Sequence, residues 1–321
     1  MFMLAGGAGF IASNLYAGLV VLGRETVIVD RLGTDDKWRN LAKHPPARLI
    51  ASEALDDFVA SHPPLETVFY LSAASDTAVI DADLSWVVNV QTSLALWRWC
   101  GARGVQFIYT SSAAIYGDGS AGFDGDASVV VLDPLRPLNL DGWTKEVFDL
   151  RVVRMVAAGE ARPPQWAGLN FFNVYALSEY HKGMALVVKT KHHETPAGRA
   201  PQLFRSEHSD IVDGGQQRDF TWVKDTVDML LWSLDNPGAN SLLNADIGQA
   251  RSLLDMAHAA CVPCNVECID MPESLHGKYQ SFTQETATKL CVAGHARQPT
   301  SLEGGVRYYA RDYLMQSDTH R

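Results

Sequence analysis

Met1-Phe-Met-Leu-Ala-Gly6-Gly-Ala-Gly9-Phe-Ile-Ala12 opens the chain, and within this stretch a short apolar run breaks into glycines. Leucines then recur at helical spacing as far as Leu22, and Gly23 is placed to cap the helix. A second apolar run, Val27–Val29, ends at Asp30. The order of strand, glycine turn, helix, strand and acid predicts a dinucleotide-binding unit.

Each residue of the turn has its own role in such a unit. Gly6 permits the tight turn, and Gly9 lets backbone N–H groups approach a pyrophosphate at the helix N-terminus. Ala12 packs the helix on the strand, and Asp30 is placed to hold an adenosine ribose. For a glycine turn alone, a loop that only packs against the sheet is the alternative.

The residues after Asp30 bear on the choice between the two nicotinamide cofactors. Arg31, Lys37 and Arg39 are cations that could hold a 2′-phosphate. They favour NADP, with NAD as the alternative. A solvated loop face is the other interpretation of any one of these cations.

The composition describes an acidic globular chain of 321 residues, with 47% hydrophobic and 20% charged residues. A net charge of −10 repels nucleic-acid backbones and anionic lipids, so neither nucleic acid nor membrane is an expected partner. The first residues lack the basic segment of a signal peptide, and no apolar run of about 18 residues could span a bilayer. We therefore expect a cytoplasmic protein.

Five cysteines raise the question of a metal or redox site. Cys261, Cys264 and Cys268 fall close together, but no fourth ligand stands at metal-site spacing. The expectation is reduced structural thiols and no metal, with a redox pair as the alternative.

Strands and helices alternate through the rest of the chain, as a parallel sheet requires. Strands are predicted at 49–50, 67–71, 105–110 and 167–172, and helices at 55–61, at 84–100 with Gly101 as the end, and at 144–158. The predicted fold is a Rossmann-type, doubly wound α/β sheet followed by a smaller C-terminal α/β lobe.

Further motifs narrow the class of protein. Ser111-Ser-Ala-Ala-Ile-Tyr-Gly117 follows a predicted strand, and Asn139-Leu-Asp-Gly-Trp-Thr-Lys145 comes later. With the glycine turn, these motifs resemble the extended short-chain dehydrogenase/reductases that act on nucleotide sugars. His181-Lys-Gly183, Arg218-Asp-Phe220 and Gly277-Lys-Tyr-Gln-Ser-Phe-Thr-Gln284 are more specific. The whole set resembles the ADP-L-glycero-D-manno-heptose 6-epimerases nearly end to end.

The resemblance implies an NADP-dependent isomerase that epimerises carbon 6 of an ADP-linked heptose, in lipopolysaccharide core biosynthesis. In that family a hydride leaves carbon 6, the carbonyl intermediate reorients, and the hydride returns to the other face. Lys182 matches one of the two family bases, and Asp141 stands where the other, a tyrosine, is expected. Lys145 is implied to hold the nicotinamide ribose, and Ser112 to hydrogen-bond the reacting oxygen. Homo-oligomers, often pentamers, are implied as well.

The resemblance also implies which residues contact the two ligands. Besides the glycine turn and the two lysines, the positions that match the family's cofactor contacts are Phe10, Ile11, Asp30, Arg31, Lys37, Leu71, Ala73, Asn89 and Val174. Besides Ser112, those that match its nucleotide-sugar contacts are Asn173, Phe204, Arg205, Ser206, Arg218 and Tyr279. The expected NAD(P)-binding domain is 1–172 with about 214–245, and the expected nucleotide-sugar-binding domain is 173–213 with 246–321.

Two of these positions also carry an argument from the residues alone. Arg218 follows two glycines in what is predicted to be a loop, where an arginine suits a bidentate grip on a diphosphate. A structural salt bridge is its alternative. Lys182 stands between a histidine and a glycine, which permits close approach of the backbone to a ligand, and a surface lysine is its alternative.

Asp141 changes the expected chemistry. Asp141 and Lys145 are four residues apart on one helical face, so an ordinary salt bridge is the alternative to a reactive pair. A carboxylate reaches about 3 Å less far than a phenol, so proton transfer would need a water. Three hypotheses follow: an impaired 6-epimerase with Lys182 as the surviving base, a redox enzyme on another nucleotide sugar, and a catalytically inactive nucleotide-sugar-binding protein.

A dehydratase is disfavoured by the motif that begins at Ser111. The related nucleotide-sugar dehydratases have an acidic pair directly after that strand, and here Ala113 and Ala114 occupy its place. Elimination of water needs such a general acid and base.

Overall fold

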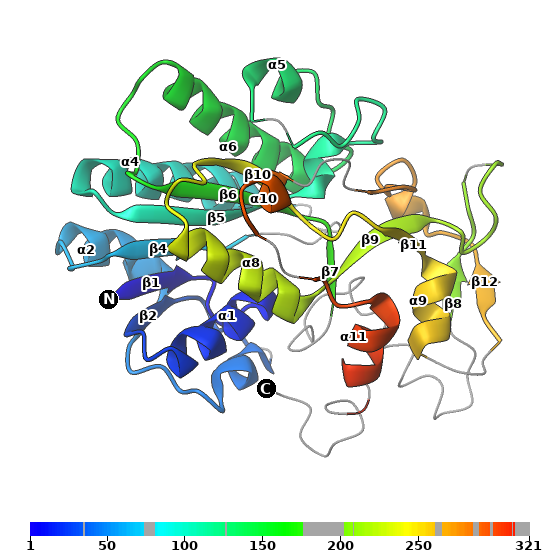
Figure 1. Cartoon of the computed structure of the whole chain (residues 1–321), viewed down its shortest axis with the longest axis horizontal. Helices are drawn as coiled ribbons and strands as arrows, with labels where there is room; N and C mark the ends of the chain where they lie inside the picture. The colour runs from blue at the N-terminus through cyan, green and yellow to red at the C-terminus, as the bar shows by residue number, and fades with distance from the viewer. Residues whose placement is uncertain are drawn as a thin grey trace.

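The largest feature of the computed structural model is a sheet of seven strands in which every neighbouring pair is parallel (Figure 1). The structure describes residues 1–34, 36–73, 81–125, 127–175, 202–207, 209–260, 265–284, 289–295, 298–309 and 311. Across the sheet, the strands are β10 (Ser241–Ala245), β6 (Trp166–Phe171), β5 (Gln106–Ser112), β4 (Thr67–Tyr70), β1 (Phe2–Ala5), β2 (Thr26–Val29) and β3 (Leu49–Ile50). The strand order reverses between β1 and β4, the place where open α/β sheets bind ligands. The predicted doubly wound fold is confirmed.

Helices cover both faces of this sheet (Figure 1). One face packs against α2 (Leu55–Ala60), α4 (Ser93–Arg103) and α6 (Leu140–Ala157), and the other against α1 (Phe10–Val21) and α8 (Val223–Asp235). Alternate strand residues point to opposite faces, so Phe107 joins the core under α4 and α6 while Ile108 joins the core under α1 and α8. Strands buried on both faces have continuous apolar sequences, which explains the runs seen at the sequence level.

A smaller lobe lies at the far end of the molecule from α2 (Figure 1). It contains the sheet β11-β9-β7 and the pair β12-β8. Its elements are β7 (Asn173–Tyr175), β8 (Gln202–Phe204), β9 (Gln217–Trp222), β11 (Ala250–Ser252), α9 (Leu253–Ala260), β12 (Glu267–Ile269) and α11 (Leu302–Tyr309). A separate apolar cluster holds these elements together, and it includes Trp222, Met256 and Val306.

Shorter helical segments connect these layers. They include η1 (Asp36–Leu41), η2 (Ser52–Ala54), α3 (Ala82–Trp86), η3 (Val87–Thr92), η4 (Ala113–Tyr116), α5 (Val129–Leu132), η5 (Glu273–Leu275) and α10 (Lys289–Val292). Among the described residues, no helix has both the length and the apolar composition needed to cross a bilayer.

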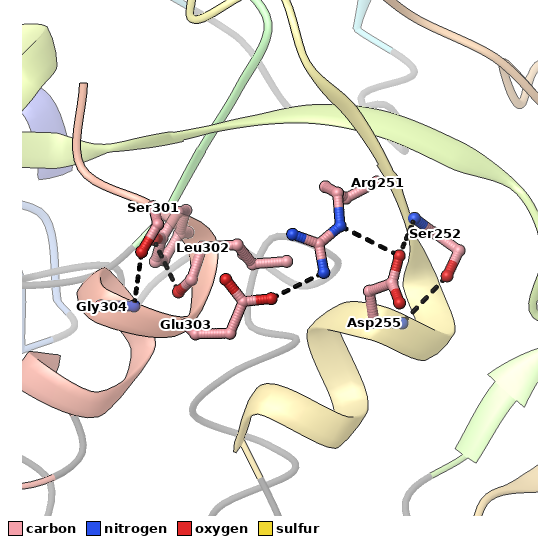
Figure 2. Close-up of polar contacts among 8 residues, drawn as sticks. Arg251, Ser252, Asp255, Ser301, Leu302, Glu303 and Gly304 are labelled. Carbon is pink, nitrogen blue, oxygen red and sulfur yellow. Dashed lines mark hydrogen bonds and ion pairs between the residues drawn. The ribbon is translucent and has the colours of Figure 1, made fainter. Parts of the chain in front are cut away.

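An arginine links two helices of the small lobe (Figure 2). Arg251 pairs with Asp255 of α9 at 3.1 Å and with Glu303 of α11 at 2.6 Å. Ser252 and Asp255 also exchange hydrogen bonds, backbone N–H to side-chain oxygen in each direction, at 3.0 and 2.9 Å. This reciprocal pattern is a capping box, and it starts α9 directly after β11.

The predicted helix at 84–100 with Gly101 as its end is wrong in two respects. It consists of α3, the π-helical η3 and α4, and it ends at Gly104, whose φ of 69° is left-handed. Gly101 lies inside α4, where a Cβ would stand 3.0 Å from the carbonyl carbon of Arg162. Gly101 is therefore a packing glycine, and Gly104 supplies the left-handed turn that ends the helix.

The predicted start of the helix at residue 144 is also wrong. α6 begins at Leu140, and Asn139 caps it by accepting a hydrogen bond from the Gly142 N–H at 2.9 Å. The first turn carries Asp141 and Gly142 at buried positions, so the apolar pattern does not mark where the helix starts. Asp141 and Lys145 consequently both lie in this helix.

Candidate active site

The glycine turn joins β1 to α1 in a conformation that only glycine accepts. Gly6 has a φ of +78°, and a Cβ there would lie 2.7 Å from the backbone N of Ser72. Gly9 is the N-cap of α1, and no side chain caps the helix there. The predicted cap at Gly23 is confirmed by its φ of +66°. A helix N-terminus without a side-chain cap, next to a glycine turn, fits a dinucleotide pyrophosphate.

Asp30, which follows β2, and Asn40, which lies in η1, both form hydrogen bonds to this turn. The carboxylate of Asp30 accepts a hydrogen bond from the Ala8 N–H at 2.8 Å, and the amide of Asn40 donates to the Ala8 carbonyl at 2.9 Å. Both side chains are buried, at 6% exposure each. Sequence reasoning missed Asn40, because a lone polar residue in a short helical segment carries no spacing signal.

The three predicted cations differ in what their side chains contact. Lys37 Nζ lies 2.6 Å from Asp30 Oδ1. Arg31 pairs with Glu53, and Arg39 pairs with Asp36 at 3.2 Å. Of these three, Lys37 is the one whose side chain lies against the acid at the end of β2.

The other predicted cofactor residues fall into two groups. Leu71 and Ala73 directly follow β4, and the Leu71 N–H donates to the Ala5 carbonyl at 3.0 Å. Ile11 and Val174 are partly buried and pack against the core under α1 and α8. The ring of Phe10, at the start of α1, is buried in the apolar cluster of the small lobe.

Three ionisable side chains follow one another along a single face of α6. Asp141, Lys145 and Asp149 are spaced four residues apart, and their exposed fractions are 8%, 5% and 0%. The ammonium of Lys145 donates to the Thr110 carbonyl of β5 at 2.7 Å.

Asp149 is a buried carboxyl that the sequence analysis missed. It accepts hydrogen bonds from the hydroxyl of Tyr109 at 3.0 Å and from the hydroxyl of Ser111. Burial raises the pKa of Asp149 to about 7, although both hydroxyls and the charge of Lys145 oppose the rise. The spacing of four residues after Lys145 was the signal that could have identified it.

Asn89 connects η3 to the first turns of α6. Its side-chain amide donates to the Thr144 hydroxyl at 2.8 Å, and its exposed fraction is 1%. The Thr144 hydroxyl is within 3.0 Å of the Asp141 carbonyl. Short π-helical segments such as η3 are frequent at functional sites, and here the segment turns Asn89 toward α6.

Ser112 ends β5 and stands next to the start of α6. Its hydroxyl accepts a hydrogen bond from the Ala114 N–H at 3.1 Å, at the first turn of η4. A Cβ on Gly142 would lie only 2.5 Å from the Ala114 carbonyl oxygen, so α6 packs directly on η4. This contact brings the segment that carries Asp141 beside the segment that carries Ser112.

Arg218 lies in strand β9 and not in a loop as predicted. Arg218 is 5% exposed, and its Cζ lies 4.8 Å from the ring centre of Tyr279. Phe204 packs edge-on against the same ring, with 6.2 Å between centroids. Burial lowers the pKa of Arg218, and Tyr279 opposes this effect. Pairing with β7 and β11, which are remote in sequence, explains why the glycines before Arg218 do not extend the loop to it.

The remaining residues predicted to contact the nucleotide sugar lie in or next to β7 and β8. Arg205 follows β8 and pairs with Asp270 at 2.8 Å, and the Ser206 N–H donates to Asp213 at 3.0 Å. Asn173 begins β7, and its side-chain oxygen lies 3.5 Å from the Thr283 hydroxyl.

Lys182, Cys261 and Cys264 lie outside the described residues, whereas Cys268 is a free cysteine in β12. Within the part of the chain that the structure describes, no group of His, Cys, Asp and Glu could hold a metal ion.

Comparison with known proteins shows the family of this chain. The model of the NAD dependent epimerase/dehydratase family matches residues 2–245. An ADP-L-glycero-D-manno-heptose-6-epimerase from Nitratidesulfovibrio vulgaris strain Hildenborough is 41% identical, with 100% of both chains covered. The protein of the same name from Fusobacterium nucleatum is 35% identical, again with 100% of both chains covered. The chain belongs to the ADP-L-glycero-D-manno-heptose 6-epimerase family. Epimerases are isomerases, and the matching family is one of nicotinamide-dependent enzymes.

Solved structures agree with the fold of this epimerase. The crystal structure of the Helicobacter pylori ADP-L-glycero-D-manno-heptose-6-epimerase aligns with a TM-score of 0.78 and 22% identity, over 97% of this chain and 95% of that chain. A UDP-N-acetylglucosamine 4-epimerase from Methanobrevibacter ruminantium M1 aligns with a TM-score of 0.79 and 19% identity, over 97% and 96%.

Proposed function

We propose that this epimerase inverts carbon 6 of an ADP-linked manno-heptose with NADP, and that Asp141 slows the reaction. The contact of α6 with η4 at Gly142 carries the proposal, because it puts Asp141 and Ser112 on adjoining segments. Lys145 follows Asp141 by one helical turn, with its ammonium held at the Thr110 carbonyl. A hydroxyl, an ammonium and a carboxylate on such adjoining segments suit removal of a proton from an alcohol.

The residues of the site would divide the work among binding, orientation and proton transfer. Arg218 would grip the diphosphate, for which its planar guanidinium is suited. Ser112 can accept from the Ala114 N–H and still donate its own hydrogen to the reacting oxygen. Lys145 would hold the nicotinamide ribose with its ammonium, as its position in the family motif implies. Bound NADP would supply the chemistry of taking a hydride from carbon 6 and returning it to the opposite face.

Asp141 would accept the hydroxyl proton through a water, since its carboxylate falls about 3 Å short of a phenol's reach. Lys182 would be the base on the other side of the sugar, by its position in the family motif. A proton route through water and a carboxylate of low basicity both lower the rate. Epimerisation that is slow for its family is the expected result.

The proposed preference for NADP rests on Lys37. Its ammonium lies against Asp30, where the carboxylate alone would repel a 2′-phosphate. A cation at this position would partly neutralise the acid and attract the phosphate.

A second candidate function is nucleotide-sugar binding without turnover. The observation that favours it is the carboxylate at position 141, because the residues proposed to grip the ligands do not depend on it. This candidate predicts that ADP-heptose raises the melting temperature of the protein and that no NADPH absorbance appears. One observed turnover would exclude it. A redox reaction on another nucleotide sugar would instead form NADPH only with a different sugar from a substrate panel.

The deciding experiment compares the natural chain with Asp141→Tyr and Asp141→Asn. Epimer interconversion of ADP-heptose is followed by chromatography, and NADP reduction by absorbance. Restoring the phenol is expected to raise the rate by about 10² or more, and the amide, which is no base, is expected to abolish the remaining rate. An active natural enzyme that Asp141→Asn leaves unchanged would show that Asp141 has no role in proton transfer.

We also propose the domain division and the assembly. Residues 1–172 with about 214–245 would bind the cofactor, and residues 173–213 with 246–321 the nucleotide sugar. The pairing of β10 with β6 supports the first unit, although β9 from the same span pairs with β7 and β11. The proposed assembly is a homo-oligomer, a pentamer. Light scattering of the purified protein gives the mass that tests it.

A further inference from the structure

One short segment of the small lobe, residues 279–284, contacts both the proposed diphosphate-binding arginine and the loop after β5. We infer that Gln280 in this segment is a positioning residue, which couples occupancy of the nucleotide-sugar site to the placement of Ser112. The inference deepens the proposed function and rests on it for the identity of the reaction.

The side-chain amide of Gln280 spans the two ends of η4. Its Nε2 donates to the Ala113 carbonyl at 3.1 Å and to the Gly117 carbonyl at 2.7 Å. Ala113 directly follows Ser112, and Gly117 ends the segment with a left-handed φ of 62°. One primary amide therefore ties together both ends of the turn that begins at Ser112.

The same segment is anchored to the strand that carries Arg218. The Gln217 N–H donates to the Ser281 carbonyl at 3.0 Å, and the Thr283 N–H donates to the Gln217 carbonyl at 3.1 Å. Tyr279 meanwhile lies under the Arg218 guanidinium. A displacement of Arg218 on binding an anion would act on residues immediately before and after Gln280.

α6 also contacts η4. The Gly142 backbone approaches the Ala114 carbonyl so closely that a Cβ would be 2.5 Å from it. With both Gln280 and α6 in contact with it, η4 has little freedom to move independently of either. The placement of Ser112 relative to Asp141 thus depends on the small lobe, where the nucleotide sugar is proposed to bind.

Gln280→Met tests this dependence, because it keeps the length of the side chain and removes both donors. Gln280→Glu goes further, since a carboxylate would face two carbonyl oxygens. Gln284→Met is the matched control: Gln284 Nε2 donates at 3.2 Å to the Gly248 carbonyl, away from η4. All three variants are made in the full chain, and a thermal melt identifies any that fails to fold.

The first readout is steady-state epimerisation of ADP-heptose. Because a misplacement of about 1 Å can cost on the order of 10² in rate, we expect Gln280→Met to lower kcat by about that factor. KM and the ADP dissociation constant should stay within about 3-fold, and Gln284→Met should resemble the natural chain. Equal kcat values for Gln280→Met and Gln284→Met would overturn the inference.

The second readout does not need turnover. Calorimetry gives the factor by which ADP changes the affinity for NADP, for which coupled sites have values from about 5-fold upward. We expect ADP to change the NADP affinity by about 5-fold or more in the natural chain and in Gln284→Met. In both Gln280 variants we expect ADP to leave the NADP affinity unchanged. If the natural chain neither turns over nor shows coupling, the inference is overturned together with the proposed function. Coupling that is lost only with Gln280, in a chain without turnover, supports the inference and rejects the proposed reaction.

Discussion

The guanidinium of Arg218 lies over the ring of Tyr279, with 4.8 Å between Cζ and the ring centre, and both residues come from segments of the small lobe that are remote in sequence. The stack orients a buried cation, and its Nη1 also donates to the Gln217 carbonyl at 2.9 Å. An anionic ligand would gain from this charge, because charge-assisted hydrogen bonds are stronger in a buried setting.

Arg218→Lys is expected to weaken ADP binding by about 10- to 100-fold, since a lysine replaces a bidentate, stacked contact by a point charge. Tyr279→Leu should weaken it by a smaller factor of about 3 to 10 through loss of the stack. NADP binding serves as the control, measured with ADP by calorimetry. An equal loss of NADP affinity in both variants would mean that the cluster supports the fold rather than the nucleotide sugar.

The contact of Lys37 with Asp30 predicts a change in cofactor preference. Lys37→Met removes the cation beside the acid, so the dissociation constant of NADP should rise by about 10-fold while that of NAD stays within about 2-fold. Fluorescence titration of both cofactors gives the ratio. Arg39→Met is the control, because Arg39 pairs with Asp36 at 3.2 Å instead of with Asp30. If the control variant changes the ratio as much as Lys37→Met, the preference is a general effect of positive charge.

The buried carboxyl of Asp149 predicts a pH dependence of stability. Its pKa is about 7 in the folded chain, against about 3.9 when unfolded. As the pH rises between these values, the unfolded chain loses a proton that the folded chain keeps, so the free energy of unfolding falls, and above about pH 7 this contribution levels off. The difference of about 3 pKa units corresponds to roughly 4 kcal/mol.

Asp149→Asn should flatten this dependence, because an amide does not titrate. Urea unfolding at several pH values from about 5 to 8 measures the slope, which is expected to be steeper in the natural chain. Burial and the neighbouring Asp219 raise the pKa of Asp246, so a residual slope of the same sign should persist in the variant. Identical slopes would show that Asp149 is not the titrating group. Asp133→Asn, at an exposed carboxyl, is the control.

The link between α9 and α11 in Figure 2 predicts a stability difference between two arginines. The side chain of Arg251 is 26% exposed and pairs with Asp255 and Glu303. That of Arg154 is 55% exposed and pairs with Asp133. Arg251→Met should lower the free energy of unfolding by about 1 to 2 kcal/mol, and Arg154→Met by less than about 0.5 kcal/mol. Chemical denaturation measures both, and a larger loss at Arg154 would contradict the assignment.

Local patterns were sufficient for the first three elements of the chain. The glycine turn and the leucine spacing predicted β1, α1 and β2, because turn geometry and helix periodicity involve residues close in sequence. The end of α4 was misplaced because Gly101 and Gly104 look equally suited to end a helix in the sequence. Only the left-handed φ of Gly104 distinguishes them. Arg218 was predicted in a loop since strand β9 exists only through its pairing with β7 and β11.

The sequence by itself determined the order of strands and helices, the glycine turn with its acid, and the family, all of which depend on short-range spacing or motif identity. The tertiary structure alone decided which polar groups meet. The carboxyl of Asp149 reaches Tyr109 across 40 positions, and Gln280 reaches Ala113 across 167. Such contacts follow from strand order and sheet register, which bring side chains together irrespective of their separation along the chain, and no local pattern encodes them.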